Sequence, residues 1–400
     1  MLKGNAVIGQ SGGPTSVINS SLAGVVTAAK DAGCIENIYG MRFGIEGLMD
    51  ENLIDLGKEV EPTIEGLKTT PSSALGSCRH KLQEEDLPKV LDVLQRYNIR
   101  YFFLIGGNDT MDTIHRVEKY AVEKGYDLRG IGIPKTVDND LYGTDHTPGF
   151  ASAARYMALS VKQAGVLARD MQKVDQFVIF QCIGRDAGWL VAATALAKQN
   201  EDDAPHILCM PERDFDKEKF LADVEKAYKK YGWVSVVCGE GITYADGTPV
   251  SASETKDKFN NVEFGAMGGT SVAVQLHKMI SEKFGWRGEF QITESLPMSA
   301  ADRAAQLDID EAFMAGENAV RLAEQGQSGV MVSLERVPGD TYDCTTGTAP
   351  LSEVAVRAKP MPDEFINDEG NFITDAFIEY AKPLLGEMPD YVRLACHKVK

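Results

Sequence analysis

Short apolar runs alternate along the chain with longer segments in which apolar residues recur at helical spacing. The apolar runs predict strands at residues 5–8, 101–105, 130–133, 177–182, 206–210 and 234–238. The segments with helical spacing predict helices at residues 17–32, 86–97, 149–170, 188–199, 216–231 and 270–284. Strands and helices that alternate in this way are typical of parallel sheets covered by helices on both faces. We therefore expect an α/β fold with doubly wound parallel sheets.

Two of the predicted strands are apolar at consecutive positions, which indicates that both of their faces are buried. They contain the runs FFLI at 102–105 and VIF at 178–180, as expected for central strands. A chain of 400 residues with 44% hydrophobic content can bury two cores. We predict one domain at residues 1–147 and a second at 148–295. The segment 296–400 is expected to return to the first domain and to end in a C-terminal extension.

The charge balance and the cysteines narrow the classes of partner. The 41 basic and 59 acidic residues give a formal net charge of -18. This charge disfavours nucleic acid or an anionic membrane as the main partner, because both are polyanions.

The seven cysteines are odd in number and never spaced C-x-x-C, which favours reduced thiols over disulfides or zinc. Because no stretch reaches the roughly 18 apolar residues of a membrane span, we expect a cytoplasmic protein.

Three loops with unusual composition follow predicted strands, which is where parallel sheets bind ligands. The first, QSGGPT at 10–15, places Gly12 and Gly13 before a predicted helix. Glycines let the backbone approach a ligand, and a helix N-terminus offers free N–H groups to phosphate. The loop lacks both the Gly-Lys-Ser/Thr ending of a P-loop and a G-x-G-x-x-G pattern. Taken alone, it fits a tight structural turn about equally well.

The second loop, IGGNDTM at 105–111, follows the most apolar predicted strand. Its two glycines could expose N–H groups to phosphate, and Asp109 could bind a cation. An ordinary helix N-cap by Asn108 or Asp109 would explain the same residues.

The third loop, PKTVDND at 134–140, brings a lysine, a hydroxyl and two carboxylates together within a few residues. Phosphoryl transfer needs such groups: a base that orients the attacking hydroxyl, a carboxylate for Mg²⁺, and a cation that offsets charge on the moving group. A solvated Asp/Asn turn is the competing interpretation. Three such loops on successive strand ends together favour a site that handles phosphate.

These loops together resemble the signatures of the phosphofructokinase family. The family's Ser-Gly-Gly after the first strand corresponds to residues 11–13, its Gly-Gly-Asp-(Gly/Asp)-Ser to residues 106–110, and its Pro-(Gly/Lys)-Thr-Ile-Asp-Asn-Asp to residues 134–140. The segments LGSCR at 75–79, IGR at 183–185 and GEG at 239–241 resemble further family motifs. The resemblance is close over about residues 5–245 and looser beyond. It implies two α/β domains, the first for donor phosphate and the second for sugar phosphate, with the active site in the cleft between them.

The resemblance implies a role for each matching residue. Asp138 would take the proton from the 1-hydroxyl of a sugar phosphate, with support from Asp140. The other implied catalytic residues are Lys135, Thr136 and Arg185. The implied contacts to the donor phosphates are Gly12, Gly13, Arg79, Asp109 and Lys135. The implied contacts to the sugar phosphate are Thr136, Asp138, Ile183, Gly184, Arg185 and Glu240. A surface ion pair for Arg185 and a turn position for Glu240 are the simpler alternatives.

Two positions separate the phosphoryl donors within this family. Members that use ATP have glycine where this chain has Asp109, which leaves room for the nucleotide's α-phosphate. A carboxylate there would crowd and repel that phosphate. ATP users also have glycine in place of Lys135, whose ammonium group can neutralise a leaving phosphate. The resemblance therefore implies pyrophosphate as the donor, and an ATP-dependent sugar kinase of the same fold is the nearest alternative.

The chain departs from the family pattern at the metal and at the acceptor. Asn108 replaces an aspartate that helps to bind Mg²⁺, so the ion would depend more on Asp109 and Asp140, with Asn108 as a neutral ligand. The Gln-Arg pair that holds the sugar phosphate in many members is replaced by TESLPMS at 293–299. Arg287 and Arg303 flank this stretch and could substitute, as could cations from a neighbouring subunit. Arg287 is the candidate contact. The expected acceptor is fructose 6-phosphate, with sedoheptulose 7-phosphate as an alternative.

The resemblance also implies a homodimer or homotetramer that catalyses a reversible, Mg²⁺-dependent step of glycolysis and gluconeogenesis. A non-catalytic paralogue that binds sugar phosphate and regulates an active subunit is a second alternative, because some family members pair active and regulatory chains. The presence of Lys135, Asp138, Asp140 and Arg185 argues against that alternative.

Overall fold

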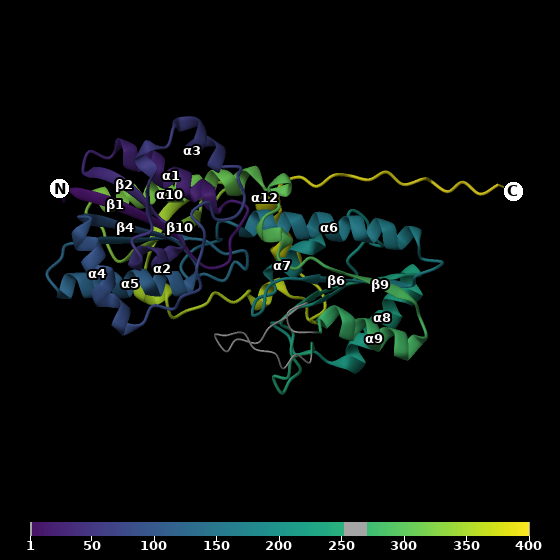
Figure 1. Cartoon of the computed structure of the whole chain (residues 1–400). Coiled ribbons are helices and arrows are strands. Elements are labelled where there is room, and N and C mark those ends of the chain that lie inside the picture. Colours follow the sequence, from purple (N-terminus) through teal and green to yellow (C-terminus); the bar gives the residue numbers. More distant parts are fainter. Residues whose placement is uncertain (1, 252–269, 400) are drawn as a thin grey trace.

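The computed structural model describes residues 2–251 and 270–399 and contains two sheets, one in each half of the molecule (Figure 1). The strands are β1 (Gly4–Gln10), β2 (Ile35–Met41), β3 (Leu53–Asp55), β4 (Ile99–Gly106), β5 (Arg129–Pro134), β6 (Phe177–Cys182), β7 (Ile207–Cys209), β8 (Val234–Gly239), β9 (Gly288–Ile292), β10 (Val330–Arg336) and β11 (Cys344–Pro350). The helices are α1 (Ile18–Asp31), α2 (Gly44–Met49), α3 (Glu61–Leu67), α4 (Leu87–Arg96), α5 (Asn108–Glu123), α6 (Phe150–Asp170), α7 (Trp189–Ala193), α8 (Lys217–Tyr231), α9 (Val272–Phe284), α10 (Gln306–Glu324), α11 (Leu351–Val354) and α12 (Asp375–Leu385).

Both sheets are dominated by parallel strands. Within the described ranges, the larger sheet has the order β11-β10-β5-β4-β1-β2-β3 and the smaller sheet the order β7-β8-β6-β9. Only the two edge strands of the larger sheet, β3 and β11, pair antiparallel among these elements. Two separate cores cover the faces of the larger sheet: α1 and α10 on one side, and α2, α4 and α5 on the other. The predicted α/β class with doubly wound parallel sheets is confirmed.

The chain builds the larger sheet in two passes. Strands β1 to β5 come first, β6 to β9 then form the smaller sheet, and β10 finally pairs with β5. Figure 1 shows this return, because the late strand β10 lies in the left-hand sheet together with the early strands β1 and β4. The long helix α10 packs against α1 from the beginning of the chain.

Several elements differ from the sequence-based expectation. The strand predicted at 177–182 has the observed bounds of β6, whereas the helix predicted at 188–199 ends at Ala193 and continues as a 3₁₀ turn, Thr194–Ala197. Helices α5 and α10 and strands β2, β9 and β10 were not predicted. Strand β9 is mostly exposed and therefore lacks a strong hydrophobic pattern. Helix α5 begins with the polar residues NDT, although its buried residues Met111, Ile114 and Val117 recur at helical spacing.

Glycines let α1 and α10 cross at close range. A β-carbon on Gly24 would lie 2.1 Å from Phe313 O, and one on Gly316 would lie 2.1 Å from Ser21 O. Both contacts are with backbone atoms, which cannot rotate away. The crossing therefore depends on the absence of side chains at these two positions.

Gly24→Ala is expected to lower the free energy of unfolding by about 1–3 kcal/mol, because overpacking outweighs the gain of about 1 kcal/mol in helix propensity. Gly66→Ala in α3 is the matched control, because a side chain there would meet nothing within 4 Å. The control should be neutral or more stable by about 0.5–1 kcal/mol. Urea unfolding of both variants measures the difference, and equal stabilities would contradict the close crossing.

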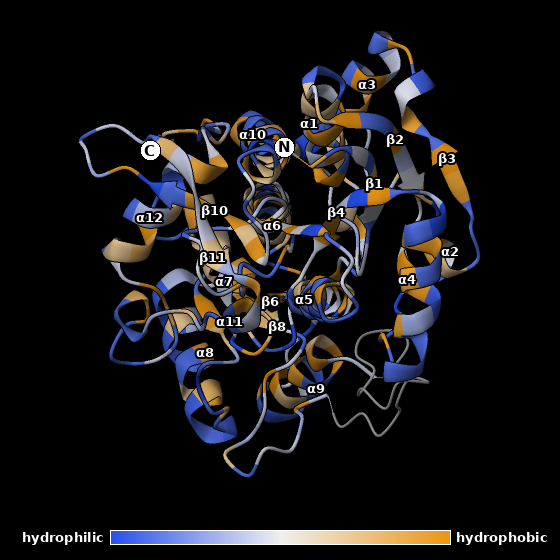
Figure 2. Ribbon diagram, turned by 90° about the vertical axis from the view of Figure 1, so that its left-hand side faces the viewer, coloured by the Kyte–Doolittle hydropathy of each residue, from blue (hydrophilic) through white to orange (hydrophobic). Residues whose placement is uncertain are grey.

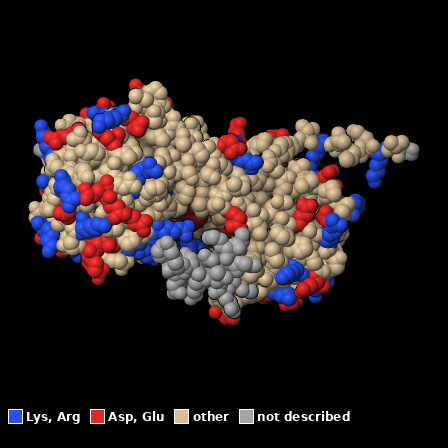
Figure 3. All heavy atoms as spheres, in the orientation of Figure 1, with Lys and Arg blue, Asp and Glu red and all other residues tan. Residues whose placement is uncertain are grey.

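Hydrophobic and charged residues are distributed as in a globular protein with solvated helices. Figure 2 shows helices such as α5 and α8 with hydrophilic and hydrophobic residues on different sides. On the face drawn in Figure 3, acidic and basic side chains are interspersed at both ends of the molecule. Across the described residues, no helix combines the length and the hydropathy needed to cross a membrane.

Candidate active site

The loops that follow β5 and β6 meet between the two sheets. Asp138 lies in the loop after β5, and Gly184 lies just after the end of β6. A β-carbon on Gly184 would lie 3.3 Å from Asp138 Oδ1 and 3.1 Å from Ala187 O. Gly184 also has a φ of +112°, a conformation that favours glycine. The glycine thus allows a carboxylate from one sheet to approach the backbone of the other.

Glu240 and Arg185 lie beside Gly184 and Asp138. The backbone N–H of Gly184 donates to Glu240 Oε1 at 3.2 Å, and Glu240 directly follows β8. The exposed Arg185 is close enough to lower the pKa of both Asp138 and Glu240. The smaller sheet therefore contributes a glycine, a cation and a carboxylate that face Asp138.

Lys135 joins the loop after β5 to the loop after β1. Its Nζ donates to Gly13 O at 2.5 Å, and a β-carbon on Gly12 would lie 3.4 Å from the same nitrogen. Ser77 Oγ donates to Gly12 O at 2.6 Å, so the segment before Arg79 packs on this loop. Arg79 in turn acts electrostatically on Lys135 and lowers its pKa. Two cations and a glycine turn thus lie together beside Asp138.

Burial and neighbouring charges shift the pKa of Asp138. Burial is the largest cause, and the carboxylates of Asp140 and Glu240 add to it, so that the pKa rises to about 7. Arg185 and Lys135 act in the opposite direction without cancelling this rise. A carboxyl group with a pKa near neutrality can gain and lose a proton under ordinary conditions.

Lys135 is shifted in the opposite sense. Its side chain is buried, and burial lowers its pKa to about 8, against the raising effect of Asp138 and Asp140. Asp140 also has a raised pKa, with burial as the largest cause, although a hydrogen bond with Thr136 lowers it. The loop thus holds a buried ammonium group together with two carboxyl groups whose pKa values are raised.

Asn108 and Asp109 occupy the start of α5. The amide nitrogen of Asn108 donates to Val354 O at 3.0 Å and to Arg357 O at 2.8 Å, which leaves its Oδ1 as the available ligand atom. The carboxylate of Asp109 is 83% exposed and lies 4.0 Å from Lys81 Nζ. Neither side chain caps α5, whose capping residue is Gly107. The simple N-cap interpretation of these two residues is therefore wrong.

Arg287 lies away from the other candidate residues. It precedes β9, which runs parallel to β6, so it sits at the amino end of the smaller sheet, whereas Gly184 and Glu240 follow carboxyl ends. The five residues of β9 separate the two ends by roughly 16 Å. Arg287 is 76% exposed and pairs with Asp175 at 3.0 Å. The structure does not bring Arg287 into the cluster, and it corrects the expectation that this side chain replaces the missing arginine within the same chain.

Arg303 is also engaged elsewhere, because it donates to Ser160 Oγ at 2.9 Å on α6. The segment 293–299 itself reaches the cluster. A β-carbon on Gly13 would lie 3.7 Å from Met298 Sδ, and Glu294 raises the pKa of Glu240. The segment therefore brings a carboxylate, rather than an arginine, toward Glu240.

Comparison with known proteins identifies the family. The sequence profile described as Phosphofructokinase matches residues 5–322. The chain belongs to the phosphofructokinase family. The fold agrees with this assignment. The chain superposes on the solved structure of the pyrophosphate-dependent phosphofructokinase from Nitrosospira multiformis with a TM-score of 0.87. The two chains are 38% identical, with 98% of this chain and 94% of that chain covered.

Other phosphofructokinase relatives are similar over nearly their full length. The pyrophosphate–fructose 6-phosphate 1-phosphotransferase of Halomonas elongata is 38% identical, with 100% of this chain and 98% of the relative covered. A sulfofructose kinase of Alkalicoccus urumqiensis is 33% identical, with 90% of this chain and 91% of the relative covered. Phosphofructokinase relatives that share one architecture thus carry names with different sugar acceptors.

Proposed function

We propose that this phosphofructokinase transfers a phosphoryl group from pyrophosphate to the 1-hydroxyl of fructose 6-phosphate. The products are fructose 1,6-bisphosphate and phosphate, in a reversible reaction of glycolysis and gluconeogenesis. The observation that carries the proposal is the loop 135–140, in which Lys135 Nζ bonds to Gly13 O while Asp138 closely approaches Gly184. One loop thereby joins a glycine turn suited to phosphate with a carboxylate suited to a sugar hydroxyl.

The proposed mechanism assigns the base and the cations. Asp138 accepts the proton of the sugar 1-hydroxyl as that oxygen attacks the nearer phosphorus of pyrophosphate. The bond from this phosphorus to the bridging oxygen breaks, and phosphate leaves with its charge offset by Lys135. Backbone groups of Gly12 and Gly13, together with Arg79, hold the donor. The proposed contacts to the sugar phosphate and the moving group are Thr136, Ile183, Gly184, Arg185 and Glu240.

The available oxygen atoms fit Mg²⁺. Asp109 and the Oδ1 of Asn108 lie at the start of α5. Burial raises the pKa of Asp140, so a bound cation would favour the ionised form of this carboxyl group. Carboxylate and amide oxygens are ligands that Mg²⁺ prefers. When bound, the ion would neutralise charge on the phosphates.

The activity is expected to have a bell-shaped dependence on pH. Asp138 must be ionised to act as the base, so kcat/KM should fall as the pH drops below about 7. Lys135 must be protonated to offset the leaving phosphate, so kcat/KM should also fall as the pH rises above about 8. Steady-state rates from about pH 5.5 to about 9.5 measure both limbs. In Lys135→Arg the basic limb should move to higher pH, because an arginine stays charged; an unmoved limb would contradict the role of Lys135.

The donor is tested with purified protein, Mg²⁺ and fructose 6-phosphate, offered pyrophosphate or ATP in parallel. We expect turnover with pyrophosphate, because the carboxylate of Asp109 and the ammonium of Lys135 disfavour a nucleotide. Turnover with ATP alone would make the chain an ATP-dependent kinase of this fold. Absence of turnover with either donor would favour a regulatory paralogue.

The choice of sugar acceptor is a separate part of the proposal and is tested separately. Glu294, which raises the pKa of Glu240, belongs to the segment 293–299 that replaces the Gln-Arg pair of many family members, and one relative is named a sulfofructose kinase. The experiment compares kcat/KM for fructose 6-phosphate, sedoheptulose 7-phosphate and 6-deoxy-6-sulfofructose with pyrophosphate as donor. The proposal requires fructose 6-phosphate to be the best of the three.

The two sheets support a division of the chain into two domains, each of which binds one substrate. We propose a donor-phosphate domain at residues 1–147, completed by the chain after about residue 295, and a sugar-phosphate domain at 148–295. The segment 296–400 is proposed to contain both this return to the first domain and a C-terminal extension.

We also propose a cytoplasmic homodimer or homotetramer, in which a neighbouring subunit supplies the cation missing from the acceptor site. Light scattering of the purified protein measures the number of subunits.

A further inference from the structure

Asn139 separates the two carboxylates of the loop after β5 and has an unusual backbone conformation. Its φ is +55°, and its side chain is fully buried. The left-handed conformation is unfavourable for residues with a side chain, although asparagine tolerates it better than most. This turn sets the directions in which Asp138 and Asp140 leave the backbone. Whatever holds Asn139 therefore also holds both carboxylates.

Both ends of the Asn139 amide are bonded to the C-terminal part of the chain. Its Nδ2 donates to the hydroxyl of Tyr380 at 2.9 Å, and its Oδ1 accepts from Lys359 Nζ at 3.3 Å. Lys359 and Tyr380 lie beyond residue 322, where the match to the phosphofructokinase profile ends. A segment outside the matched region thus reaches the centre of the site.

The same two residues fix the end of the loop. Lys359 Nζ donates to Asp145 O at 2.7 Å, and the Tyr380 hydroxyl donates to the same oxygen at 2.9 Å. The backbone N–H of Lys359 donates to Asp140 O at 2.8 Å. The loop is therefore bonded to Lys359 and Tyr380 at residues 139, 140 and 145.

Tyr380 is itself held by several contacts. The Tyr380 ring packs against Trp189 and Phe365, with ring centroids 5.4 and 5.5 Å away. Arg336 donates to Tyr380 O at 3.1 Å. These contacts tie α12 to strand β10 and to helix α7, which belong to different parts of the molecule. We call Lys359 and Tyr380 together the brace of this loop. The brace is held, through Tyr380, by contacts from both halves of the molecule.

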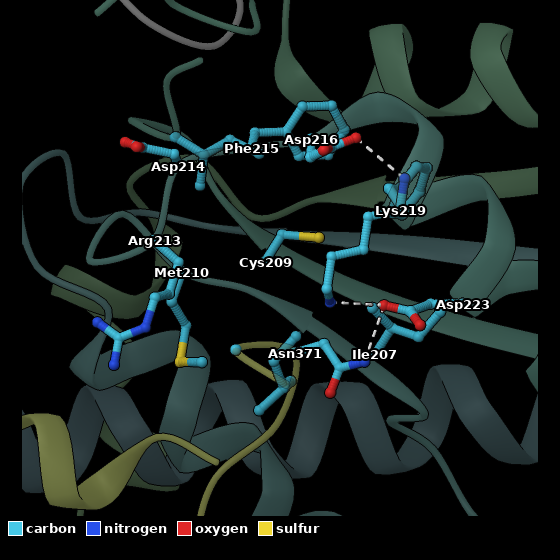
Figure 4. A pocket seen from close by; sticks show the side chains of 14 residues that line it. Ile207, Cys209, Met210, Arg213, Asp214, Phe215, Asp216, Lys219, Asp223 and Asn371 are labelled. Carbon is cyan, nitrogen blue, oxygen red and sulfur yellow. Dashed lines mark hydrogen bonds and ion pairs between the residues drawn. The ribbon is translucent and has the colours of Figure 1, made fainter. Parts of the chain in front are cut away.

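A small cavity shows how the segment between Lys359 and Tyr380 is anchored. This cavity of about 60 Å³ lies beside β7 and α8, and Figure 4 shows Lys219 and Asn371 both turned toward Asp223. Asp223 accepts from Lys219 Nζ at 3.2 Å and from Asn371 Nδ2 at 2.8 Å. The backbone N–H of Leu208 also donates to Asn371 O at 2.8 Å. The segment is thus fastened to the smaller sheet as well as to the loop.

We propose that Lys359 and Tyr380 are positioning residues for phosphoryl transfer, which hold Asn139 in its left-handed conformation and so fix the directions of Asp138 and Asp140. This inference rests on the proposed function. Neither residue is the base or a phosphate contact in the proposed mechanism. Because catalysis depends steeply on the placement of the base, loosening the brace lowers kcat more than it raises KM.

The test compares Tyr380→Phe with Tyr126→Phe. Tyr380→Phe keeps the packed ring and removes the hydroxyl between Asn139 and Asp145. Tyr126→Phe removes a buried hydroxyl with two backbone partners, Leu94 O and Ile99 O, far from the loop. We expect kcat to fall about tenfold in Tyr380→Phe, with KM for both substrates within about twofold. The control should lose similar thermal stability and keep its kcat.

Three further measurements complete the test. Lys359→Met should reduce kcat by about a hundredfold, and Tyr380→Phe should add little to the loss already present in Asn139→Ala. Amide hydrogen exchange of residues 138–145 should rise in Tyr380→Phe and stay unchanged in Tyr126→Phe. A Tyr380→Phe enzyme with wild-type kcat, or with unchanged exchange in this loop, would overturn the proposal. If the wild-type protein turns over neither donor, the proposed function fails, while the exchange measurement still decides whether the brace exists.

Discussion

Asp138→Asn is expected to lower kcat by roughly two to four orders of magnitude, the usual contribution of a general base. The amide has nearly the shape of the carboxylate but cannot take the proton of the sugar hydroxyl. Steady-state assays with pyrophosphate and fructose 6-phosphate measure the effect, and a variant with near-normal turnover would show that the base lies elsewhere.

The same substitution is expected to stabilise the fold at about pH 8. The pKa of Asp138 rises from 3.8 to about 7 on folding. The stability associated with this carboxyl group is therefore fully present below about pH 4 and is lost as the pH rises through 7. The neutral amide of the Asp138→Asn variant escapes this loss, so the variant should gain about 1–3 kcal/mol at about pH 8 and little at about pH 4.5. Asp246→Asn, at an exposed turn, is the control and should keep full activity without this gain.

Lys135→Met is expected to reduce kcat/KM for pyrophosphate by about two to three orders of magnitude. Methionine has a similar length and suits a buried position, but it carries no charge to offset the leaving phosphate. Because burial already lowers the pKa of Lys135 to about 8, removal of the charge should leave the fold intact. The exposed Lys89, which pairs with Asp50, provides the control variant Lys89→Met, with unchanged kinetics.

The comparison of these two lysine variants also separates local from general electrostatics. If Lys89→Met lost as much activity as Lys135→Met, the effect would come from the net charge of the protein and not from the ammonium group beside Gly13. Thermal unfolding of both variants excludes a trivial loss of structure.

The candidate residues could be predicted from the sequence where they follow strong strands. The runs before Gly12, Lys135 and Ile183 are apolar and short, so the strand ends were clear, and parallel strands bring such ends together. The structure does place Gly13, Lys135 and Asp138 in one cluster. Their roles in catalysis stay predictions until the variants are measured.

Prediction from sequence was wrong where the strand itself was not recognised. Strand β9 is mostly exposed and short, so nothing in the pattern showed that Arg287 and the segment 293–299 lie at opposite ends of a strand. Because this strand was not recognised, Arg287 was named as a candidate contact, although it lies at the opposite end of the smaller sheet from Gly184 and Glu240. Lys359 and Tyr380 were missed for another reason: their contacts with Asn139 join residues more than two hundred positions apart, and no local spacing encodes such a contact.

The return of β10 to the edge of β5 has a consequence for biosynthesis. While the ribosome is still making the smaller sheet, β5 has an open edge of unpaired N–H and C=O groups, because its partner Val330–Arg336 has not yet emerged. Such an edge can pair with another nascent chain. Truncation before β10 is therefore expected to yield aggregates and not a soluble donor domain, and full-length protein should benefit from chaperones that shield this edge during translation.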